Sequence, residues 1–278
     1  MLDVHDLSKR YGAVNALDGF NLQVASGEIV GLVGHNGAGK TTFVEIASGL
    51  VRADRGYVTV NGRVPADARG DIGVTPQHIG LYPSITVREH LLLFGRLAGL
   101  RRAALAASIE ELAVALRLTE IMDRRTGVLS GGQQRRTQAA TALIHKPSVL
   151  LLDEPTAGAD LETRQAMLDV VKQRAGEGAA IVYTTHYLPE LTELHATIAV
   201  IRAGCIVARG NYDELVQGLP GEVRVIFEDE EDLRVSTTEP TATLIGLLSS
   251  TDRAISAVEL RNASLDDVYR SLAVNDAS

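Results

Sequence analysis

The sequence predicts an α/β fold built around a mostly parallel sheet. Three short, nearly continuous apolar runs rich in β-branched residues have the pattern of strands buried on both faces. They lie at residues 28–34, 148–154 and 179–186. Helical patterns follow the first two runs, at 40–50 and 160–178. Strands that alternate with helices typically form a parallel sheet with helices on its faces, so this arrangement is expected here.

The helix predicted at 160–178 has a clear apolar face and a clear end. Met167, Leu168 and Val171 fall on one side of it, as expected of a helix that packs on a core. Gly176 is expected to end it, because glycine is common just beyond helix C-termini.

An all-helical insert, at about residues 78–131, is expected to interrupt the α/β core. Helical patterns at 86–100 and 102–118 occupy most of it. Thr86 and Glu89 have the spacing of a capping box at the start of the first helix.

The chain is expected to divide into a large domain, residues 1–218, and a small C-terminal α+β appendage, residues 219–278. The segment GLPGE near residue 219 carries turn chemistry and marks this boundary. Beyond it, short strand-like runs alternate with two short helical patterns. The runs lie at 223–227, 233–237 and 255–260.

The composition is that of a folded, soluble protein. Of the 278 residues, 45% are hydrophobic and 22% are charged, near the average for globular proteins. The formal net charge of −8 disfavours binding to nucleic acids. No apolar run approaches the roughly 20 residues that span a bilayer, and no targeting segment is predicted. Cys205 is the only cysteine, so it is interpreted as a small buried hydrophobe in a reducing, cytoplasmic setting.

A phosphate-binding loop is indicated by the segment GHNGAGKT at 34–41. Glycines allow backbone N–H groups to curl around a polyphosphate, and the motif follows a predicted strand and precedes a predicted helix. Lys40 is expected to reach the β- and γ-phosphates, and the Thr41 hydroxyl is expected to ligate Mg²⁺. The predicted nucleotide contacts are Gly34, His35, Asn36, Gly37, Ala38, Gly39, Lys40, Thr41 and Thr42. The alternative is a glycine-rich turn without a ligand; the full spacing favours a phosphate-loop NTPase core.

Two adjacent carboxylates, Asp153 and Glu154, end the strand predicted at 148–154, at the sheet edge where α/β proteins bind ligands. Because neighbouring strand residues point opposite ways, Asp153 is assigned to the Mg²⁺ shell and Glu154 to polarising an attacking water. His186 ends another strand at this edge, where its imidazole could donate to a γ-phosphate oxygen. Read alone, the acidic pair could be a solvated turn and the histidine an ordinary surface or core residue.

A second stretch with exposed backbone donors begins at Ser130. The residues Ser130, Gly131 and Gly132, with the polar run after them, have the pattern of an N-cap and the first turns of a helix. Taken by themselves, these three residues are most simply a helix N-cap without a ligand.

Together these motifs resemble the nucleotide-binding subunit of ATP-binding cassette (ABC) transporters over about residues 2–215. LSGGQ at 129–133 matches the signature motif that separates this family from other phosphate-loop ATPases. The resemblance implies an N-terminal antiparallel β region, ATP and Mg²⁺ as cofactors, and a head-to-tail dimer, expected to be a homodimer. In such a dimer the signature of one subunit closes over the ATP of the other. The contacting residues would be Ser130, Gly131, Gly132 and Gln133.

Four further positions match the family. Tyr11 in KRYGAVNAL falls where the family stacks an aromatic ring on adenine. Gln77 in GVTPQ resembles the Q-loop glutamine, which links Mg²⁺ and the attacking water to the helical insert. Asp160 in EPTAGAD resembles the D-loop aspartate, and His186 the switch histidine.

Two positions depart from the family pattern. Ala159 stands where the D-loop more often carries leucine, and Thr141 where the signature helix often carries arginine. Both bear on packing in the dimer. The residues assigned to the chemistry are all present, so a hydrolytically competent site is predicted.

The C-terminal segment NASLDDVYRSLA, 262–273, resembles a terminal motif of type-2 ABC exporter subunits, and so does GLYPSITVREHL at 80–91. Ser264 is expected to cap a helix that has Asp267 at its third position. The predicted apolar stripe of this helix is Leu265, Val268 and Leu272.

The expected function is ATP binding and hydrolysis that drives a separate membrane-spanning permease, most simply an exporter. The permease contact is predicted at an exposed apolar pair, Leu81 and Tyr82, and the subunit is expected on the cytoplasmic face of the cell membrane. A rival is a non-transport ABC ATPase in translation or DNA repair, although the paired cassettes, coiled coils or zinc inserts usual there are not visible. A phosphate-loop small-molecule kinase would leave LSGGQ unexplained.

Overall fold

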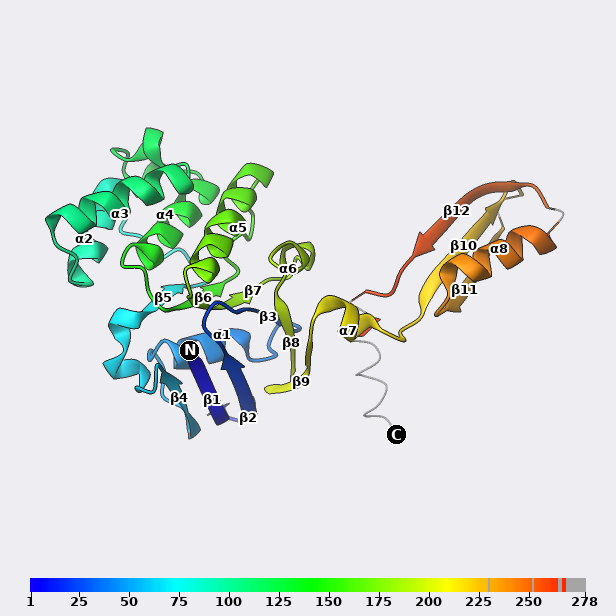
Figure 1. Cartoon of the computed structure of the whole chain (residues 1–278), viewed down its shortest axis with the longest axis horizontal. Coiled ribbons are helices and arrows are strands. Elements are labelled where there is room, and N and C mark those ends of the chain that lie inside the picture. Colours follow the sequence, from blue (N-terminus) through cyan, green and yellow to red (C-terminus); the bar gives the residue numbers. More distant parts are fainter. Residues whose placement is uncertain (230, 252, 265–266, 269–278) are drawn as a thin grey trace. The chain divides into compact units, whose positions relative to one another are not determined.

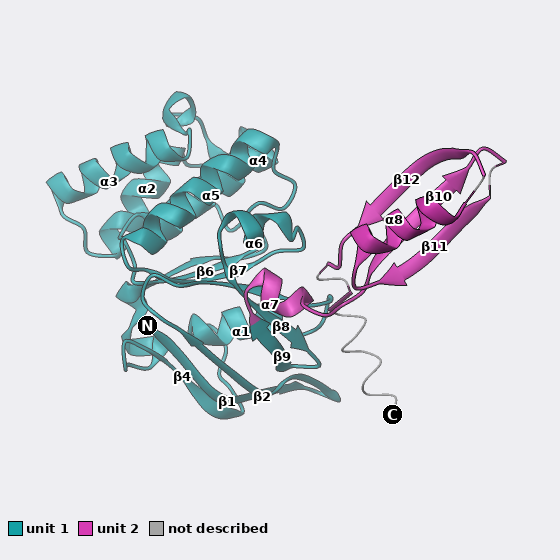
Figure 2. Cartoon of the chain, turned by 45° about the vertical axis from the view of Figure 1, so that its right-hand side comes forward, with its two compact units in different colours: residues 1–209 teal, residues 210–278 magenta. Residues whose placement is uncertain are grey.

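A computed structural model describes residues 1–229, 231–251, 253–264 and 267–268. The chain divides into two compact units, residues 1–209 and 210–278 (Figure 2). The predicted boundary, after residue 218, lies further along the chain, beyond the short helix α7 (Tyr212–Val216).

A six-stranded sheet forms the centre of the first unit (Figure 1). Its strands are β3 (Ile29–Val33), β5 (Ile72–Thr75), β6 (Val149–Asp153), β7 (Ala180–Thr184), β8 (Thr197–Arg202) and β9 (Cys205–Gly210). They follow the order β5-β6-β7-β3-β8-β9, and the four pairs from β5 to β8 are parallel. The three strands predicted from sequence are β6, β7 and β3, and every one of their residues is buried. The mostly parallel sheet, buried on both faces, is confirmed.

A second, antiparallel sheet confirms the N-terminal β region that the family resemblance implies. It has the order β2-β1-β4 and is made of β1 (Leu2–Tyr11), β2 (Val14–Val24) and β4 (Arg55–Val60). Helix α1 (Lys40–Ala47) lies between the two sheets (Figure 1). Its Phe43 is fully buried against Phe20 of β2, with the ring centroids 4.7 Å apart. Burial of this apolar face holds the start of α1 at one edge of the parallel sheet.

The insert is helical, as predicted. It contains α2 (Val87–Leu97), α3 (Arg102–Ala115) and two 3₁₀ turns, η3 (Thr119–Ile121) and η4 (Thr126–Val128), before α4 (Gly131–Leu143) begins. Two further turns, η1 (Pro65–Asp67) and η2 (Arg69–Asp71), precede β5. The predicted capping box is confirmed: the Thr86 hydroxyl accepts from the Glu89 N–H at 3.1 Å, and the Glu89 carboxylate accepts from the Thr86 N–H at 2.8 Å.

Helices α4 and α5 (Leu161–Gly176) pack on the face of the six-stranded sheet opposite α1 (Figure 1). Helix α5 ends at the predicted glycine, and the three apolar residues predicted for its inner face are all buried. The short helix α6 (Pro189–Glu193) follows β7.

The second unit is a small antiparallel sheet with one helix on it. Its strands are β10 (Gly221–Phe227), β11 (Asp232–Thr237) and β12 (Ile255–Arg261), in the order β11-β10-β12, and the helix is α8 (Pro240–Ser250). The three predicted strand runs fall within these strands. Residues Val223, Val225 and Phe227 form its core with Leu244, Leu247 and Ile255.

Part of the predicted C-terminal cap is observed. The Asp267 carboxylate accepts from the N–H and the hydroxyl of Ser264, both at 2.9 Å, and Val268 is buried. Leu265 and Leu272, predicted for the same apolar stripe, lie outside the described residues.

The expectation that Cys205 is buried is wrong. It is partly exposed, because β9 is the edge strand of its sheet. In the part of the chain that the structure describes, no helix has the length and apolar character needed to cross a membrane.

Candidate nucleotide-binding site

The loop between β3 and α1 can close tightly because its glycines lack a Cβ. Gly39 has a φ of 114°, and a Cβ there would lie 2.4 Å from the carbonyl oxygen of Ala16. A Cβ on Gly34 would lie 2.5 Å from the carbonyl oxygen of Ile201. Both distances exclude any other residue unless the backbone moves. The free N–H groups of the first turn of α1 follow this loop directly, as they do in anion sites at helix N-termini.

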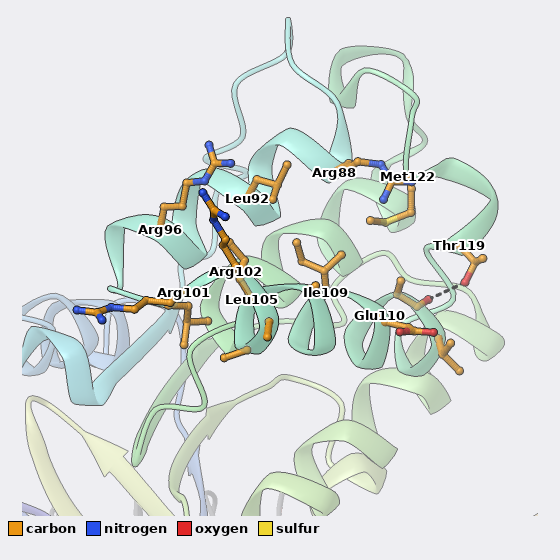
Figure 3. Close-up of a pocket in the computed structure, with 16 residues that line it drawn as sticks. Arg88, Leu92, Arg96, Arg101, Arg102, Leu105, Ile109, Glu110, Thr119 and Met122 are labelled. Atoms are coloured by element: carbon orange, nitrogen blue, oxygen red, sulfur yellow. Dashed lines mark hydrogen bonds between the residues drawn. The ribbon is translucent and has the colours of Figure 1, made fainter.

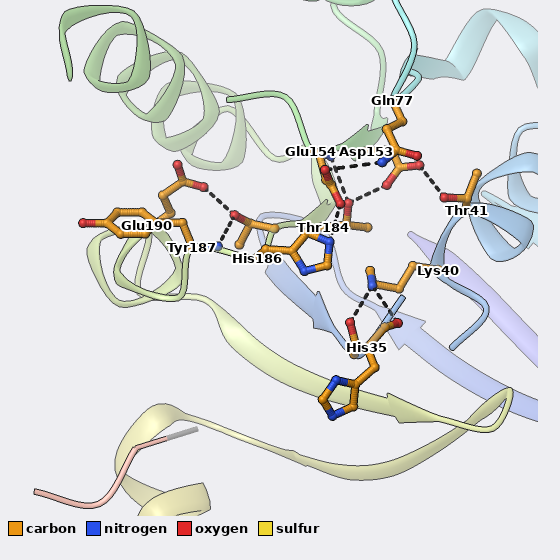
Figure 4. Close-up of polar contacts among 12 residues, drawn as sticks. His35, Lys40, Thr41, Gln77, Asp153, Glu154, Thr184, His186, Tyr187 and Glu190 are labelled. Atoms are coloured by element: carbon orange, nitrogen blue, oxygen red, sulfur yellow. Dashed lines mark hydrogen bonds and ion pairs between the residues drawn. The ribbon is translucent and has the colours of Figure 1, made fainter. Parts of the chain in front are cut away.

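Lys40 turns its ammonium back over the loop. Its Nζ donates to the carbonyl oxygens of Gly34, at 2.5 Å, and His35, at 3.2 Å (Figure 4). Burial lowers the pKa of Lys40, and the negative charges of Glu154 and Asp153 oppose that shift. The ammonium is therefore held by neutral carbonyls at a point where an anionic phosphate oxygen would be a stronger partner.

Asp153 connects the phosphate loop to the strand ends. Its carboxylate accepts from the Thr41 hydroxyl at 3.0 Å and from the Thr184 hydroxyl at 2.6 Å (Figure 4). Asp153 is the last residue of β6, and Thr184 is the last residue of the neighbouring parallel strand β7. The parallel register of these strands thus places Asp153 and Thr184 at one edge, and the start of α1 brings the Thr41 hydroxyl to the same carboxylate.

Glu154 lies just beyond β6, not within it as predicted. Its backbone is left-handed, with a φ of 50°, and its N–H donates to the hydroxyl of Thr184 at 2.9 Å. Strand alternation therefore does not set the direction of its side chain. One carboxylate oxygen is 2.6 Å from His186 Nε2, and the other is 3.4 Å from Gln77 Nε2 (Figure 4). The structure brings these three predicted residues together.

These groups surround a cavity of about 530 Å³. Its lining comprises Val14, Ala16, Asn36, Gly37, Gly39, Lys40, Thr41, Thr42, Gln77, Glu154 and His186. Among the described residues, Tyr11 and Asp160 do not line it. Tyr11 is 46% exposed, and its ring centroid lies 5.5 Å from the ammonium of Lys9. The stacking of adenine on this ring stays a prediction.

The segment from Ser130 to Gln133 also lies outside the lining of this cavity. Ser130 caps α4 through a reciprocal pair: its hydroxyl accepts from the Gln133 N–H, and its own N–H donates to the Gln133 side chain. A Cβ on Gly131 would meet no atom within 4 Å, so the start of α4 is open. Asp160 caps α5 by accepting from the Thr163 N–H at 2.7 Å, and this hydrogen bond lowers the pKa of Asp160.

Sequence reasoning missed several residues that support the site. Thr184 precedes His186 by two positions, and its place in TTH at a strand end was the available signal. Arg135 and Gln138 lie one turn apart on α4 and hydrogen-bond to the loop that carries Gln77. Gln138 directly precedes the mostly apolar run AATAL at 139–143. A polar residue beside such a run was the only feature of the sequence that could have indicated a role for Gln138.

A buried carboxylate, Glu190, hydrogen-bonds to the segments that follow β6 and β7. It is 2% exposed and accepts from the hydroxyls of Thr156, at 2.7 Å, Thr185, at 2.8 Å, and Tyr183, at 3.0 Å. Arg164 forms an ion pair with it, at 3.1 Å. Burial, together with the charge of Glu190, raises the pKa of Tyr183 well above its usual value. The carboxylate thus holds the residues that flank Glu154 and His186.

The chain is similar to known proteins of one family. The family model described as ABC transporter matches residues 17–157. The daunorubicin resistance ATP-binding protein DrrA2 of Streptomyces coeruleorubidus is 38% identical over 96% of this chain and 85% of its own length. The Nod factor export ATP-binding protein I of Burkholderia lata is 38% identical over 78% of this chain and 72% of its own length.

Solved structures have the same architecture. The ATP-binding subunit of an ABC transporter superposes with a TM-score of 0.77, at 27% identity, over 98% of this chain and 99% of that chain. A dimeric ATP-binding cassette in a post-hydrolysis state, bound to ADP and Pi, superposes with a TM-score of 0.69 at 25% identity, over 76% of this chain and 98% of that chain. The phosphate loop, the strand-end carboxylates and the signature segment all lie within residues 17–157, which the family model matches. The chain belongs to the ABC transporter family and is an ATP-binding ATPase subunit of it.

Proposed function

We propose that this ATPase powers a membrane exporter, that it works as a homodimer with Mg²⁺, and that Glu154 is its catalytic base. The observation that carries the assignment of Glu154 is its carboxylate, which lies between His186 Nε2 and Gln77 Nε2 at the wall of the cavity that contains Lys40. Relatives named for drug resistance and for Nod factor export support the exporter branch over a role in translation or DNA repair.

Each residue of the site has a role that follows from its present contacts. Lys40 would exchange its two loop carbonyls for phosphate oxygens, because an anionic acceptor binds an ammonium more strongly. Glu154 would orient the attacking water and accept its proton. His186, which now contacts Glu154, would donate to a γ-phosphate oxygen once the nucleotide enters between them.

The residues present fit a Mg²⁺ ion held partly by the nucleotide. The Thr41 hydroxyl and the Asp153 carboxylate are hard oxygen donors 3.0 Å apart, and Gln77 adds an amide oxygen nearby. Within the described residues, no group of three or more His, Cys, Asp or Glu could hold a metal alone. This is the pattern of Mg²⁺ sites completed by phosphates and water. When bound, the ion would neutralise charge on the phosphate oxygens.

The second phosphate-binding segment is proposed to serve the partner subunit. Ser130, Gly131, Gly132 and Gln133 form an open helix start that does not line the cavity of their own chain. A head-to-tail dimer would place this helix start over the ATP held by the partner. Asp160 is proposed to act at the same interface. The nucleotide cavity of each chain and the helix start of its partner would then make two sites per dimer.

The helical insert has a groove suited to a permease. A cavity of about 1150 Å³ lies along α2 and α3, with an apolar floor that includes Leu105, Ile109 and Met122 (Figure 3). Its lining also includes Arg88, Arg96, Arg101 and Arg102, and only one acid, Glu110. Arg88 pairs with Asp123, but the other three arginines have no acidic partner among the described residues.

The occupant proposed for this groove is a cytoplasmic permease segment that has apolar residues and carboxylates. The charge of the rim favours it, because a segment with unpaired carboxylates is attracted to a basic rim and one with basic residues is repelled. The apolar pair at which the permease contact was predicted, Leu81 and Tyr82, is only partly exposed. Tyr82 is 56% exposed, but Leu81 is half-buried.

Purification of the tagged chain from detergent-solubilised host membranes in the presence of ATP tests the exporter proposal. Co-purification of a polytopic membrane protein supports it, whereas ribosomal or DNA-repair proteins in its place would overturn it. The reversed-charge pair Arg96→Glu and Arg101→Glu is expected to lose the membrane partner. The matched control is the pair Arg52→Glu and Arg69→Glu, which makes the same changes at two exposed arginines that do not line the groove.

A further inference from the structure

The Gln138 side chain, on α4, hydrogen-bonds to the backbone of the loop that carries Gln77. Its Oε1 accepts from the Gly80 N–H at 2.9 Å, and its Nε2 donates to the carbonyl oxygens of Pro76, at 2.7 Å, and His78, at 3.3 Å. Gln138 is only 3% exposed. Both the oxygen and the nitrogen of the Gln138 amide therefore hydrogen-bond to a single loop. Arg135 lies three residues before Gln138 on the same helix.

Arg135 adds a fourth bond to this loop. Its Nη1 donates to the carbonyl oxygen of Gln77 itself, at 2.8 Å. Residues 76–85 belong to no helix or strand, so the loop depends on such side-chain bonds for its position. Neither Arg135 nor Gln138 lines the nucleotide cavity, and among the described contacts both reach the loop through its backbone.

The far half of the loop is attached to the segment just before Ser130. The Thr126 hydroxyl donates to the carbonyl oxygen of Tyr82 at 2.8 Å, and the Gly127 N–H donates to that of Pro83 at 3.0 Å. Both halves of the loop are thus fastened to the continuous stretch 126–138, at whose centre α4 begins. The loop and the start of α4 are therefore joined by several hydrogen bonds.

We infer that Gln138 is a positioning residue that couples the start of α4 to Gln77, and through Gln77 to Glu154. The inference rests on the proposed function, in which Ser130 meets the partner's ATP and Glu154 acts on water. Gln77 is the last link, because its Nε2 lies 3.4 Å from the Glu154 carboxylate. Closure of the dimer on α4 would then set the catalytic base through this loop.

The first test is Gln138→Met, which keeps the length of the side chain but removes its three hydrogen bonds. Its kcat for ATP should fall at least about 10-fold, because a misplacement of about 1 Å in a catalytic group can cost on the order of 10²-fold. The KM for ATP should stay within about two-fold, because the contacts of Lys40 are untouched. Gln173→Met is the matched control: it makes the same change at an exposed glutamine of α5 whose side chain hydrogen-bonds to Glu111 and Glu177 and does not line the nucleotide cavity.

A double-mutant cycle separates positioning from a general loss of structure. If Gln138 acts through Gln77, adding Gln138→Met to Gln77→Ala should lower kcat by no more than about two-fold, since coupled residues are not additive. Effects that multiply in the double variant would overturn the inference. If Gln138→Met does not fold, Arg135→Met takes its place in the same cycle.

A measurement without nucleotide tests the link itself. Hydrogen–deuterium exchange of a peptide covering 76–84 should speed up in Gln138→Met, because the Gly80 amide loses its acceptor. It should not change in Gln173→Met. An unchanged exchange rate in Gln138→Met would overturn the link. If the wild-type chain proved unable to hydrolyse ATP, the proposed function would fail, and this exchange experiment would still decide whether Gln138 holds the loop.

Discussion

Thr184→Val should destabilise the first unit more than any conservative change at the surface of the site. The Thr184 side chain is fully buried and serves two residues at once. Its hydroxyl donates to the Asp153 carboxylate at 2.6 Å and accepts from the Glu154 N–H at 2.9 Å. Valine has nearly the same shape but can make neither bond. The change therefore isolates the hydrogen bonds from packing.

The magnitude follows from the two bonds. A hydrogen bond to a charged group contributes about 1.5–3 kcal/mol, and a neutral one about 1 kcal/mol. The Glu154 N–H keeps a weaker acceptor, the Thr184 carbonyl oxygen at 3.2 Å, so its loss is only partial. The expected total is about 2–4 kcal/mol, a large share of the roughly 5–15 kcal/mol that stabilises a typical domain.

Urea unfolding of the nucleotide-free chain, followed by circular dichroism, measures this loss. Thr184→Ser is the matched control, because it keeps the hydroxyl and removes only one methyl group. It should cost about 1 kcal/mol or less. Equal stability of Thr184→Val and wild type would refute the reasoning, and so would a serine variant as unstable as the valine variant.

Three further outcomes are expected. Glu154→Gln should retain ATP binding but lower kcat about 10²–10³-fold, measured by phosphate release and nucleotide titration; undiminished turnover would refute the role of Glu154. Lys40→Ala should abolish binding of ATP in the same titration, because the buried ammonium is the cationic contact predicted for the phosphates. Burial lowers the pKa of His90, and its hydrogen bond to Thr86 and the charge of Glu89 only partly oppose that shift. The unfolded chain therefore binds a proton at this histidine more readily than the folded chain does. The free energy of unfolding should be at its full value above about pH 6.5 and should fall as the pH drops below it. His90→Gln should lessen that fall in urea midpoints compared between pH 7.5 and pH 5.5, about one unit on either side of the histidine pKa.

The parts of the site whose place in the fold was predicted correctly are those in which chemistry demands a fixed local spacing. A loop that wraps phosphates needs glycines at set positions and a helix directly after them, so residues 34–41 could be placed without knowing the rest of the fold. The three buried strands were recognisable for a similar reason, since a strand covered on both faces is apolar throughout. Glu154 shows where this reasoning stops. It lies in a left-handed turn beyond β6, and no alternation rule describes such a turn.

The residues that were missed share a different property, because each acts on a partner from another element. Thr184 meets Asp153 only because β6 and β7 are parallel neighbours in one register. Gln138 meets the loop at 76–80 only because α4 packs beside β5. Glu190 is the strongest case. A buried carboxylate is costly unless it is paired, and its partners come from β7, from the turn after β6 and from α5. No segment of sequence near residue 190 contains that set, so its role follows only from the order of strands in the sheet.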